Sequence, residues 1–390
     1  MSDSMRGRVA VIGAGVCKFG ERVEADYSDL ALEAFDEALT DATIEPEQID
    51  AAWLGTYTPA YGWGVSGASL ADALRLYGRP VVRVENYCAT GMEALRGAAY
   101  AVAAGQCDIA LALGVEKLKD RPARGLPRVG QHPVLAYGNS APGLFALAAN
   151  RYMHTFGIDR TPLAHVAVKN HANGARNAKA HMQREITIEQ ALNAPIIAEP
   201  FGLFDCCPVT DGAAAVIVCR PEIARELSSA EPVWIHGIGS SGTSARPQWE
   251  PGYDYVGFRA TRQASLRAYE QAGINDPGNE IDVAEVHDCF TWTEITNYED
   301  LGFAEKGSGW KLAVDGVTAL DGDLPVNPSG GLKSFGHPIG ASGLRMVAEI
   351  TNQLRGRCGD RQVAGARRGL AHNVGGPGAV SCVTILGQEP

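Results

Sequence analysis

Short apolar runs alternate with stretches of helical periodicity along this chain. The region 30–39 places Leu30, Ala34, Phe35 and Ala38 on one helical face, and residues 92–104 form a second helical run. Runs without polar alternation predict strands that are buried on both faces. The expected strands cover residues 8–12, 49–55, 80–84, 109–114, 213–219 and 283–286. Strands that alternate with helices predict an α/β fold with mixed sheets.

The pattern begins again near residue 231, which indicates an internal repeat. The correspondences are Leu32-x-Ala34-Phe35 with Leu266-x-Ala268-Tyr269, Ile49-Asp50-Ala51 with Ile281-Asp282-Val283, Ala89-Thr90-Gly91 with Ala341-Ser342-Gly343, and 213–219 with 379–386. They predict two similar α/β halves, residues 1–230 and 231–390. An active site built from loops of both halves would lie where the halves meet.

An insertion at about 121–195 interrupts the first half, because strand-like runs become sparse there. Between residues 121 and 184 nine basic residues face a single acid, Asp159. This excess is typical of either a solvated surface or a cradle for a phosphorylated ligand. The sequence leaves both interpretations open. Arg124, Arg128 and Lys179 are the candidates for phosphate contacts.

Composition limits the classes of function. The 390 residues carry a net charge of −11, which argues against nucleic acid as a general partner. No apolar run is long enough to span a bilayer. The nine cysteines are odd in number, irregularly spaced and without a C-x-x-C pair. We therefore expect a cytoplasmic protein without a metal site.

Cys88 lies between the strand at 80–84 and the helix at 92–104. A cysteine at such a turn faces the unpaired N–H groups and the positive end of the helix dipole, which favour the nucleophilic thiolate. The alternative is a small buried apolar residue, the more frequent role of a lone cysteine. Gly13-Ala14-Gly15 also follows a strand, but Lys18 stands where a dinucleotide fingerprint needs its third glycine.

Three stretches of the second half are candidates for further chemistry. They are His287-Asp288-Cys289-Phe290 at the end of a strand, 327–338 with His337 in a glycine-rich loop before a helix, and 372–378 before the last strand. A buried histidine with one hydrogen bond is the common alternative for each. Their places in loops between regular elements favour a functional site instead.

These motifs together resemble the thiolases, of the sterol-carrier-protein type without the lipid-carrier domain. The resemblance covers about residues 8–386 and rests on the Cys88 turn, H-D-C-F at 287–290, N-P-S-G-G at 327–331, G-H-P at 336–338, H-N-V-G-G at 372–376 and the run at 205–215. It implies the thiolase fold, two α/β halves in a five-layer αβαβα arrangement with an inserted loop domain.

The resemblance also implies roles for individual residues. Cys88 would carry the acyl group as a thioester, and His337 would take its proton and later help to stabilise an enolate oxygen. Many thiolases have a second catalytic cysteine where this chain has His372, so Cys289 of H-D-C-F would be the acid/base. His287 would hold a water in one oxyanion hole. The backbone N–H groups of Cys88 and of one among Val374, Gly375 and Gly376 would form a second oxyanion hole. Ser334 would contact coenzyme A (CoA).

Two expectations concern the resting thiols. The helix dipole and His337 should hold the pKa of Cys88 low. Cys289 should stay protonated, since it ends a buried strand with no helix behind it.

Cys206 and Cys207, which are adjacent, should pack beside the site, because neighbouring cysteines seldom satisfy disulfide geometry. Asp288 should orient backbone groups or a neighbouring side chain, which is favoured over a catalytic role.

The resemblance implies an acyltransferase that cleaves a 3-oxoacyl-CoA with CoA or runs the reverse Claisen condensation. CoA and acyl-CoA would be substrates, with no tightly bound cofactor. A homodimer or homotetramer is expected, and some relatives use a small acyl-CoA-binding partner protein. Two alternatives remain: a thiolase-fold lyase that cleaves aldol-type CoA adducts, whose known examples lack the nucleophilic cysteine, and a non-catalytic acyl-CoA-binding scaffold subunit.

Overall fold

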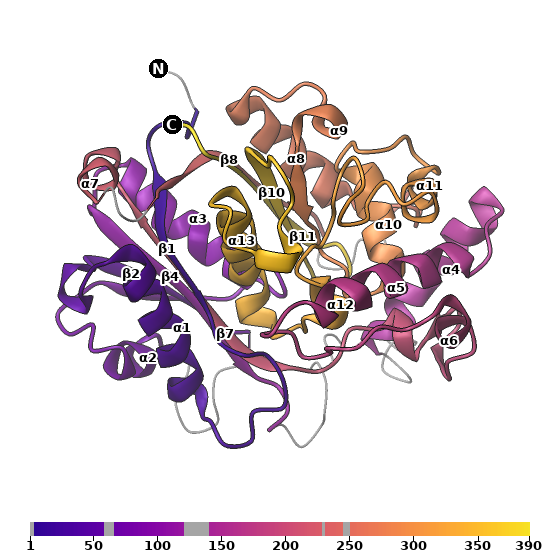
Figure 1. Cartoon of the computed structure of the whole chain (residues 1–390), viewed down its shortest axis with the longest axis horizontal. Helices are drawn as coiled ribbons and strands as arrows, with labels where there is room; N and C mark the ends of the chain where they lie inside the picture. Colours follow the sequence, from indigo (N-terminus) through magenta and orange to yellow (C-terminus); the bar gives the residue numbers. More distant parts are fainter. Residues whose placement is uncertain (1–3, 58–65, 121–139, 228–230, 245–249) are drawn as a thin grey trace.

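A nine-stranded mixed sheet forms the core of the computed structural model, which describes residues 4–57, 66–120, 140–227, 231–244 and 250–390 (Figure 1). Its strand order is β3-β2-β4-β7-β1-β8-β11-β10-β9. The strands of the first half are β1 (Ala10–Val16), β2 (Ala51–Gly55), β3 (Val81–Val84), β4 (Ile109–Lys117) and β7 (Asp211–Cys219). Those of the second are β8 (Val233–Gly242), β9 (Val283–Glu285), β10 (Arg368–Gly375) and β11 (Val380–Gly387).

The strand order repeats outward from the centre of the sheet. The order β1-β7-β4-β2 on one side is matched by β8-β11-β10-β9 on the other, with parallel pairing only at the outer strands. Asp50 accepts two backbone N–H groups at the start of β4, and Asp282 accepts two at the start of β10. The internal repeat that the sequence predicts is therefore present, and β1 and β8 join the halves through a short pairing.

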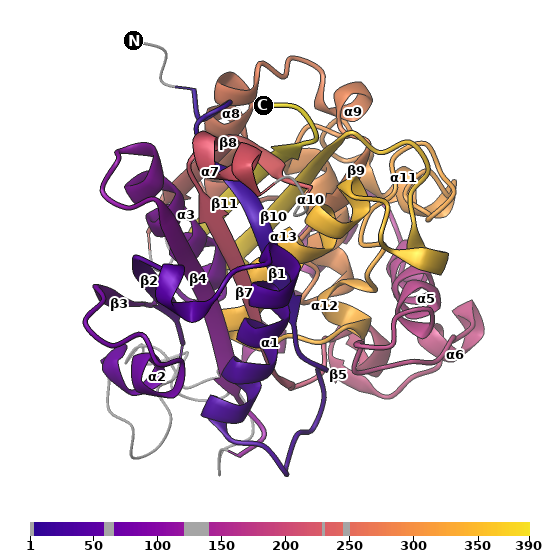
Figure 2. The ribbon, with the colours of Figure 1, turned by 60° about the vertical axis from the view of Figure 1, so that its left-hand side comes forward.

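Four helices complete a five-layer arrangement (Figures 1 and 2). Helix α1 (Tyr27–Ala42) covers the outer face of β1 and β7, and α8 (Arg259–Ala272) covers β8 and β11. Between the two groups of strands, α3 (Thr90–Ala103) packs against α13 (Ile339–Leu354). The predicted thiolase fold is confirmed.

Glycines in the two central strands allow the outer helices to approach closely. A Cβ atom at Gly13 would lie 2.3 Å from the carbonyl oxygen of Ala38 in α1, and one at Gly237 would lie 2.3 Å from that of Ala268 in α8. The Gly-x-Gly near the N-terminus is therefore part of β1 and serves helix–strand packing.

The described part of the insertion consists of helices and a non-helical segment at residues 176–187. It contains α4 (Ala141–Phe156), α5 (Thr161–Ala175) and α6 (Ile188–Leu192), and a two-stranded sheet of β5 (Ile196–Ala198) and β6 (Phe201–Gly202) follows. The remaining helices are α2 (Ala68–Ala73), α7 (Pro221–Glu226), α9 (Pro277–Glu280), α10 (Thr291–Asp300), α11 (Gly309–Val314) and α12 (Gly331–Ser334).

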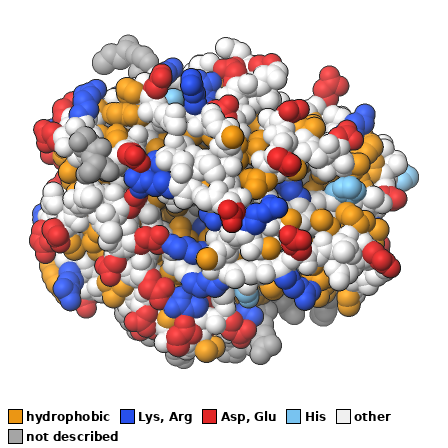
Figure 3. Space-filling view, in the orientation of Figure 1, with side chains coloured by type: hydrophobic (Ala, Val, Ile, Leu, Met, Phe, Trp, Pro, Cys, Tyr) orange, Lys and Arg blue, Asp and Glu red, His pale blue; other side chains and the backbone are white. Residues whose placement is uncertain are grey.

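The surface mixes charges of both signs. Figure 3 shows acidic and basic side chains interspersed on one face, without a continuous basic area. Among the described residues, no helix combines the length and apolar character needed to cross a membrane.

Candidate active site

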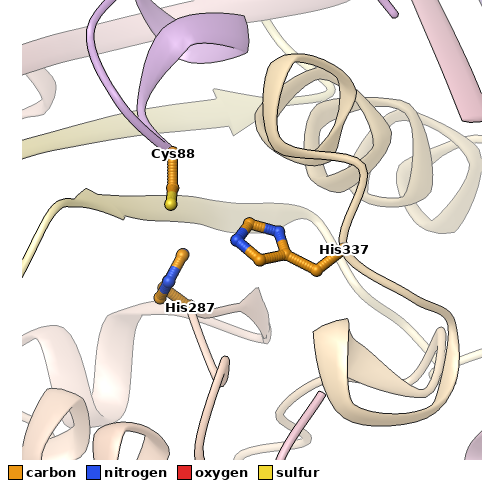
Figure 4. A group of neighbouring side chains, drawn as sticks. All are labelled: Cys88, His287 and His337. Carbon is orange, nitrogen blue, oxygen red and sulfur yellow. The ribbon is translucent and has the colours of Figure 1, made fainter. Parts of the chain in front are cut away.

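Three reactive side chains from distant parts of the sequence meet at the centre of the molecule. The sulfur of Cys88 and one ring nitrogen each of His287 and His337 lie within 4.8 Å of one another (Figure 4). Cys88 comes just before α3, His287 follows β9, and His337 comes just before α13. The structure thus brings together three of the four side chains that the sequence proposes for catalysis.

A strained turn presents Cys88. Tyr87 has φ +51°, a left-handed conformation that is unfavourable for a bulky side chain. The hydroxyl of Thr90 braces the turn, because it donates to the carbonyl of Tyr87 at 2.6 Å and accepts from the N–H of Asn86 at 2.8 Å. The turn therefore holds the thiol at the start of α3, facing the two histidines.

A hydrogen-bond chain sets the tautomer of His337. The hydroxyl of Ser342 gives its proton to the carbonyl of Pro338 at 2.9 Å, so at 2.7 Å from His337 it must accept from Nδ1–H. Nε2 then carries a lone pair. That atom is buried, has no hydrogen-bond partner among the described residues, and points toward Cys88 and His287 in Figure 4. In this tautomer His337 Nε2 can accept a proton.

His287 takes the opposite tautomer. Its Nδ1 accepts a hydrogen bond from the side-chain amide of Asn373 at 2.9 Å, which leaves the proton on Nε2. Burial lowers the pKa of His287 well below its usual range, and burial also lowers that of His337 to about 3. Both rings are neutral, so one is an acceptor and the other a donor.

The expectation of a low pKa for Cys88 is wrong for the resting protein. Burial raises the pKa of this thiol to about 12, and the negative charge of Glu116 adds to the effect. Hydrogen bonds from the N–H groups of Gly376 and of Cys88 itself oppose it but do not outweigh it. Because neutral His337 supplies no positive charge, the resting pair is thiol and imidazole.

Cys289 is a buried thiol beside the trio formed by Cys88, His287 and His337. Burial raises its pKa well above the usual range, and Cys207 and Cys88 add to the increase. Its sulfur lies 4.0 Å from the hydroxyl of Thr293. The expectation that no helix follows was wrong, since α10 begins at Thr291; desolvation nevertheless keeps the thiol protonated.

The N-termini of three helices converge on this centre. Cys88 precedes α3, Cys289 precedes α10 and His337 precedes α13. Helix N-termini carry partial positive charge and unpaired N–H groups. The site is therefore suited to a negative charge that develops on a bound substrate rather than one that is present at rest.

The glycine-rich turn of residues 374–376 closes one side of the site. A Cβ atom at Gly375 would lie 2.8 Å from the carbonyl oxygen of Asn86, and Gly376 has φ +60°. Only glycine fits this approach to the Cys88 turn. Of Val374, Gly375 and Gly376, it is Gly376 whose N–H contacts the Cys88 sulfur, beside the N–H of Cys88 itself. Val374 lies buried in β10.

The four tentative CoA residues lie in different surroundings. Arg124 and Arg128 fall outside the described residues. The Lys179 ammonium contacts the carboxylate of Glu37 and the carbonyl of Val16. Ser334 is buried and donates to the carbonyl of Met182 at 2.7 Å.

Asp288 orients backbone groups, as predicted. Its carboxylate accepts from the N–H groups of Leu332 and Lys333 at 2.6 and 3.1 Å, and from the Asn170 amide at 2.8 Å. Burial and the nearby Glu294 raise its pKa to about 7. It thereby ties the H-D-C-F turn to α12, on the loop that carries His337.

Cys206 and Cys207 pack beside the site, also as predicted. The N–H of Cys207 donates to the carbonyl of Cys289 at 3.0 Å, and all nine cysteines are free. His372 lies behind His287: its Nε2 bonds Thr261 at 3.1 Å and its Nδ1 is 3.5 Å from the N–H of His287. His372 therefore has no free ring nitrogen that could move a proton.

Sequence reasoning missed the two residues that set the tautomers, Ser342 and Asn373. Both belong to motifs that the sequence analysis named. Ser342 lies within the repeated Ala341-Ser342-Gly343, and Asn373 follows His372 in the H-N-V-G-G motif. Their roles depend on which ring nitrogen each contacts. No spacing along the chain reveals that contact.

Comparison with known proteins identifies the family. The description "Thiolase, N-terminal domain" matches residues 9–222, and "Thiolase C-terminal domain-like" matches residues 244–388. The acetyl-CoA acetyltransferase of Methanothermobacter thermautotrophicus is 41% identical over 386 residues, which cover 97% of this chain and 99% of that protein.

Two further proteins are similar over most of the chain. Sterol carrier protein 2 of Bos taurus is 35% identical over 394 residues, covering 96% of this chain and 72% of that protein. The solved structure of an Ltp2-ChsH2(DUF35) aldolase superposes with a TM-score of 0.84 at 25% identity, covering 99% of both chains. The chain is an acyltransferase that belongs to the thiolase family.

Proposed function

We propose that this protein transfers acyl groups through a Cys88 thioester, cleaving a 3-oxoacyl-CoA with CoA or running the reverse Claisen condensation. One observation carries the proposal: the half-buried thiol of Cys88 lies within 4.8 Å of ring nitrogens of the buried His287 and His337. The Nε2 of His337 has no hydrogen-bond partner among the described residues. A neutral thiol beside a neutral base can react only when a substrate arrives, which protects the nucleophile between turnovers.

Acylation would begin when His337 Nε2 takes the Cys88 proton as the sulfur attacks the 3-oxo carbon. The N–H groups of Cys88 and Gly376, which already face the sulfur, would stabilise the oxyanion that forms. The bond between C2 and C3 then breaks, and the acetyl-CoA enolate leaves toward His287. The Nε2–H of His287 is oriented by Asn373 to donate to that enolate oxygen.

Cys289 would complete the proton transfers. It protonates C2 of the enolate and becomes a thiolate, which then takes the proton of the incoming CoA thiol. The CoA sulfur attacks the acyl group on Cys88, and His337 returns its proton to the departing Cys88 sulfur. Each residue ends as it began, and all protons balance.

Intact-mass measurement after mixing with acetyl-CoA tests the acyl-enzyme. We expect one acetyl group per chain, absent in Cys88→Ala, while Cys382→Ala, a buried cysteine away from the trio, keeps it. A wild-type protein that acquires no acetyl group from acetyl-CoA or from any 3-oxoacyl-CoA would refute the mechanism. A screen of 3-oxoacyl chain lengths, with bulky ring substrates, would define the acyl group.

A lyase that cleaves aldol-type CoA adducts is the second candidate, favoured by the similarity to the solved aldolase. The presence of both Cys88 and Cys289 supports the thiolase reaction instead. An aldol reaction forms no thioester on the enzyme, so aldehyde or ketone release by Cys88→Ala would favour the lyase. A scaffold subunit would give neither product nor adduct.

The remaining assignments are proposals of the same kind. The basic insertion, with Arg124 and Arg128, would bind the CoA phosphates, whereas Lys179 already contacts Glu37.

The open edge of β3, where Val82 is 47% exposed, would pair with a second copy in a homodimer or homotetramer. A small partner protein of the kind named with the aldolase could bind acyl-CoA. The nine free thiols are in keeping with a cytoplasmic location. The similarity to sterol carrier protein 2 supports a proposed role in lipid metabolism.

A further inference from the structure

We propose that Cys88, His287 and His337 also form a binding site for a thiophilic divalent cation such as Zn²⁺, and that the bound cation blocks the nucleophile. One sulfur and two imidazole nitrogens are a ligand set that zinc binds well. All three atoms lie within 4.8 Å of one another. A tetrahedral zinc ion needs them about 3.5 Å apart, so the side chains must close by roughly 1 Å.

An independent observation points to a ligand at this place. His337 is only 7% exposed, and its buried Nε2 has no hydrogen-bond partner in the part of the chain that the structure describes. The Ser342 hydroxyl holds the proton on Nδ1, so the free nitrogen carries a lone pair directed at the sulfur. Metal-binding histidines are typically oriented in this way through their other ring nitrogen.

His287 needs one rearrangement, and the structure provides for it. At present its Nδ1 accepts from Asn373, which places the proton on Nε2. The side-chain oxygen of Asn373 is buried, and no described residue gives it a hydrogen bond. If that amide turns over, the oxygen can accept from Nδ1–H, and Nε2 becomes free to bind a cation. Asn373 is therefore a switch between the donor form of His287 and its ligand form.

The binding reaction balances without a redox partner. The Cys88 thiol releases its proton to solvent and forms a sulfur–metal bond, while each histidine contributes one lone pair. The His287 proton moves from Nε2 to Nδ1, and water fills the fourth position. An acyl group and the cation use the same sulfur, so each should exclude the other; that last point alone rests on the proposed function.

Co²⁺ is the probe, since its absorption reports its ligands without any turnover. We expect one Co²⁺ per chain, with a thiolate charge-transfer band and visible bands typical of tetrahedral geometry, displaced by Zn²⁺. Cys88→Ser should lose the charge-transfer band, and His337→Gln should weaken binding at least about tenfold. Cys289→Ser should keep the band, because that thiol lies outside the trio.

Asn373→Asp gives the sharpest test, because it should act in opposite directions on binding and catalysis. A carboxylate can only accept from His287 Nδ1–H, so it fixes the ligand tautomer and should tighten Co²⁺ binding by about 10- to 100-fold. The same change removes the donor form and should slow acyl transfer.

Iodoacetamide provides a readout that does not depend on the proposed function. Saturating Zn²⁺ should protect Cys88 from alkylation in peptide mapping, even if the protein proves to have no acyl-transfer activity. Unaltered alkylation of Cys88 under saturating Zn²⁺, an undiminished charge-transfer band in Cys88→Ser, or weaker Co²⁺ binding by a folded Asn373→Asp would each overturn the proposal.

Discussion

Ser342→Ala removes the group that prepares His337 as a base. In the native site the hydroxyl accepts from His337 Nδ1–H at 2.7 Å and donates to Pro338, which leaves the lone pair of Nε2 facing Cys88. Without the hydroxyl, Nδ1–H is buried and unpaired, and the competing tautomer would place a proton on Nε2. That tautomer cannot accept the proton of Cys88.

The magnitude follows from the cost of an unpaired buried donor. Losing one partner of a buried hydrogen bond costs about 1–3 kcal/mol. If this cost falls on the reactive tautomer, acylation of Cys88 should slow roughly 5- to 150-fold, at 1.36 kcal/mol for each factor of ten. Alanine suits the helix at this position, so the free energy of unfolding should change much less.

Rapid-quench measurement of acetyl transfer from acetyl-CoA to Cys88 is the assay, with steady-state thiolysis beside it. Thr351→Val is a matched control on the same helix, because that hydroxyl is also buried but has no hydrogen-bond partner within the described ranges. It should acylate at the wild-type rate. A folded Ser342→Ala protein that acylates as fast as wild type would show that the hydroxyl does not set the tautomer, and the base would have to be reassigned.

Other consequences can be checked with the same reagents. Cys289→Ala should still form the acyl-enzyme but lose thiolysis by about 10²–10⁴-fold, whereas Cys88→Ala loses both; wild-type turnover by Cys289→Ala would remove it from the mechanism. Because the pKa of His337 is lowered to about 3 and that of Cys88 raised to about 12, the neutral pair persists between about pH 5 and about pH 9, and acylation should vary little across that range; a steep rise near neutral pH would indicate a thiolate nucleophile instead. Charge reversal of Arg124 and Arg128 should raise the KM for CoA, and an unchanged KM would assign them to plain surface. Light scattering should show a dimer or larger assembly, and a monomer at micromolar concentration would contradict the proposed pairing through β3.

Much of the fold could be predicted from the sequence, because the pattern of strands and helices occurs twice along the chain. Each half repeats the same order of apolar runs and helical faces, and Asp50 and Asp282 even make the same backbone contacts at equivalent strands. Periodicity reports burial directly, so strands such as β4 and β7 were evident. The close approach of α1 and α8 to glycines of the central strands could not be predicted, since it depends on three-dimensional packing.

The site was predicted by residue type but not by protonation state. Motif positions singled out Cys88, His287, His337 and Cys289 as candidates, and the structure brings the first three together at the centre, while their catalytic roles stay predictions. The resting charge of Cys88 was wrong, because a helix dipole can be inferred from sequence whereas the depth of burial cannot. Desolvation outweighs the N–H groups that face the sulfur, and a neutral histidine adds no positive charge.

The repeat also explains how one scaffold supplies both the proposed nucleophile and the proposed base. Helices α3 and α13 are equivalent in the two halves, and each carries a hydroxyl residue, Thr90 or Ser342, at the same place in Ala-Thr-Gly or Ala-Ser-Gly. Thr90 bonds back to the turn that carries Cys88, and Ser342 bonds back to Pro338 and to His337. The same device thus braces the preceding turn in both halves. Because the two helices pack against each other at the centre, the repeat brings a braced thiol and a braced imidazole face to face, and only the residue in each turn distinguishes nucleophile from base.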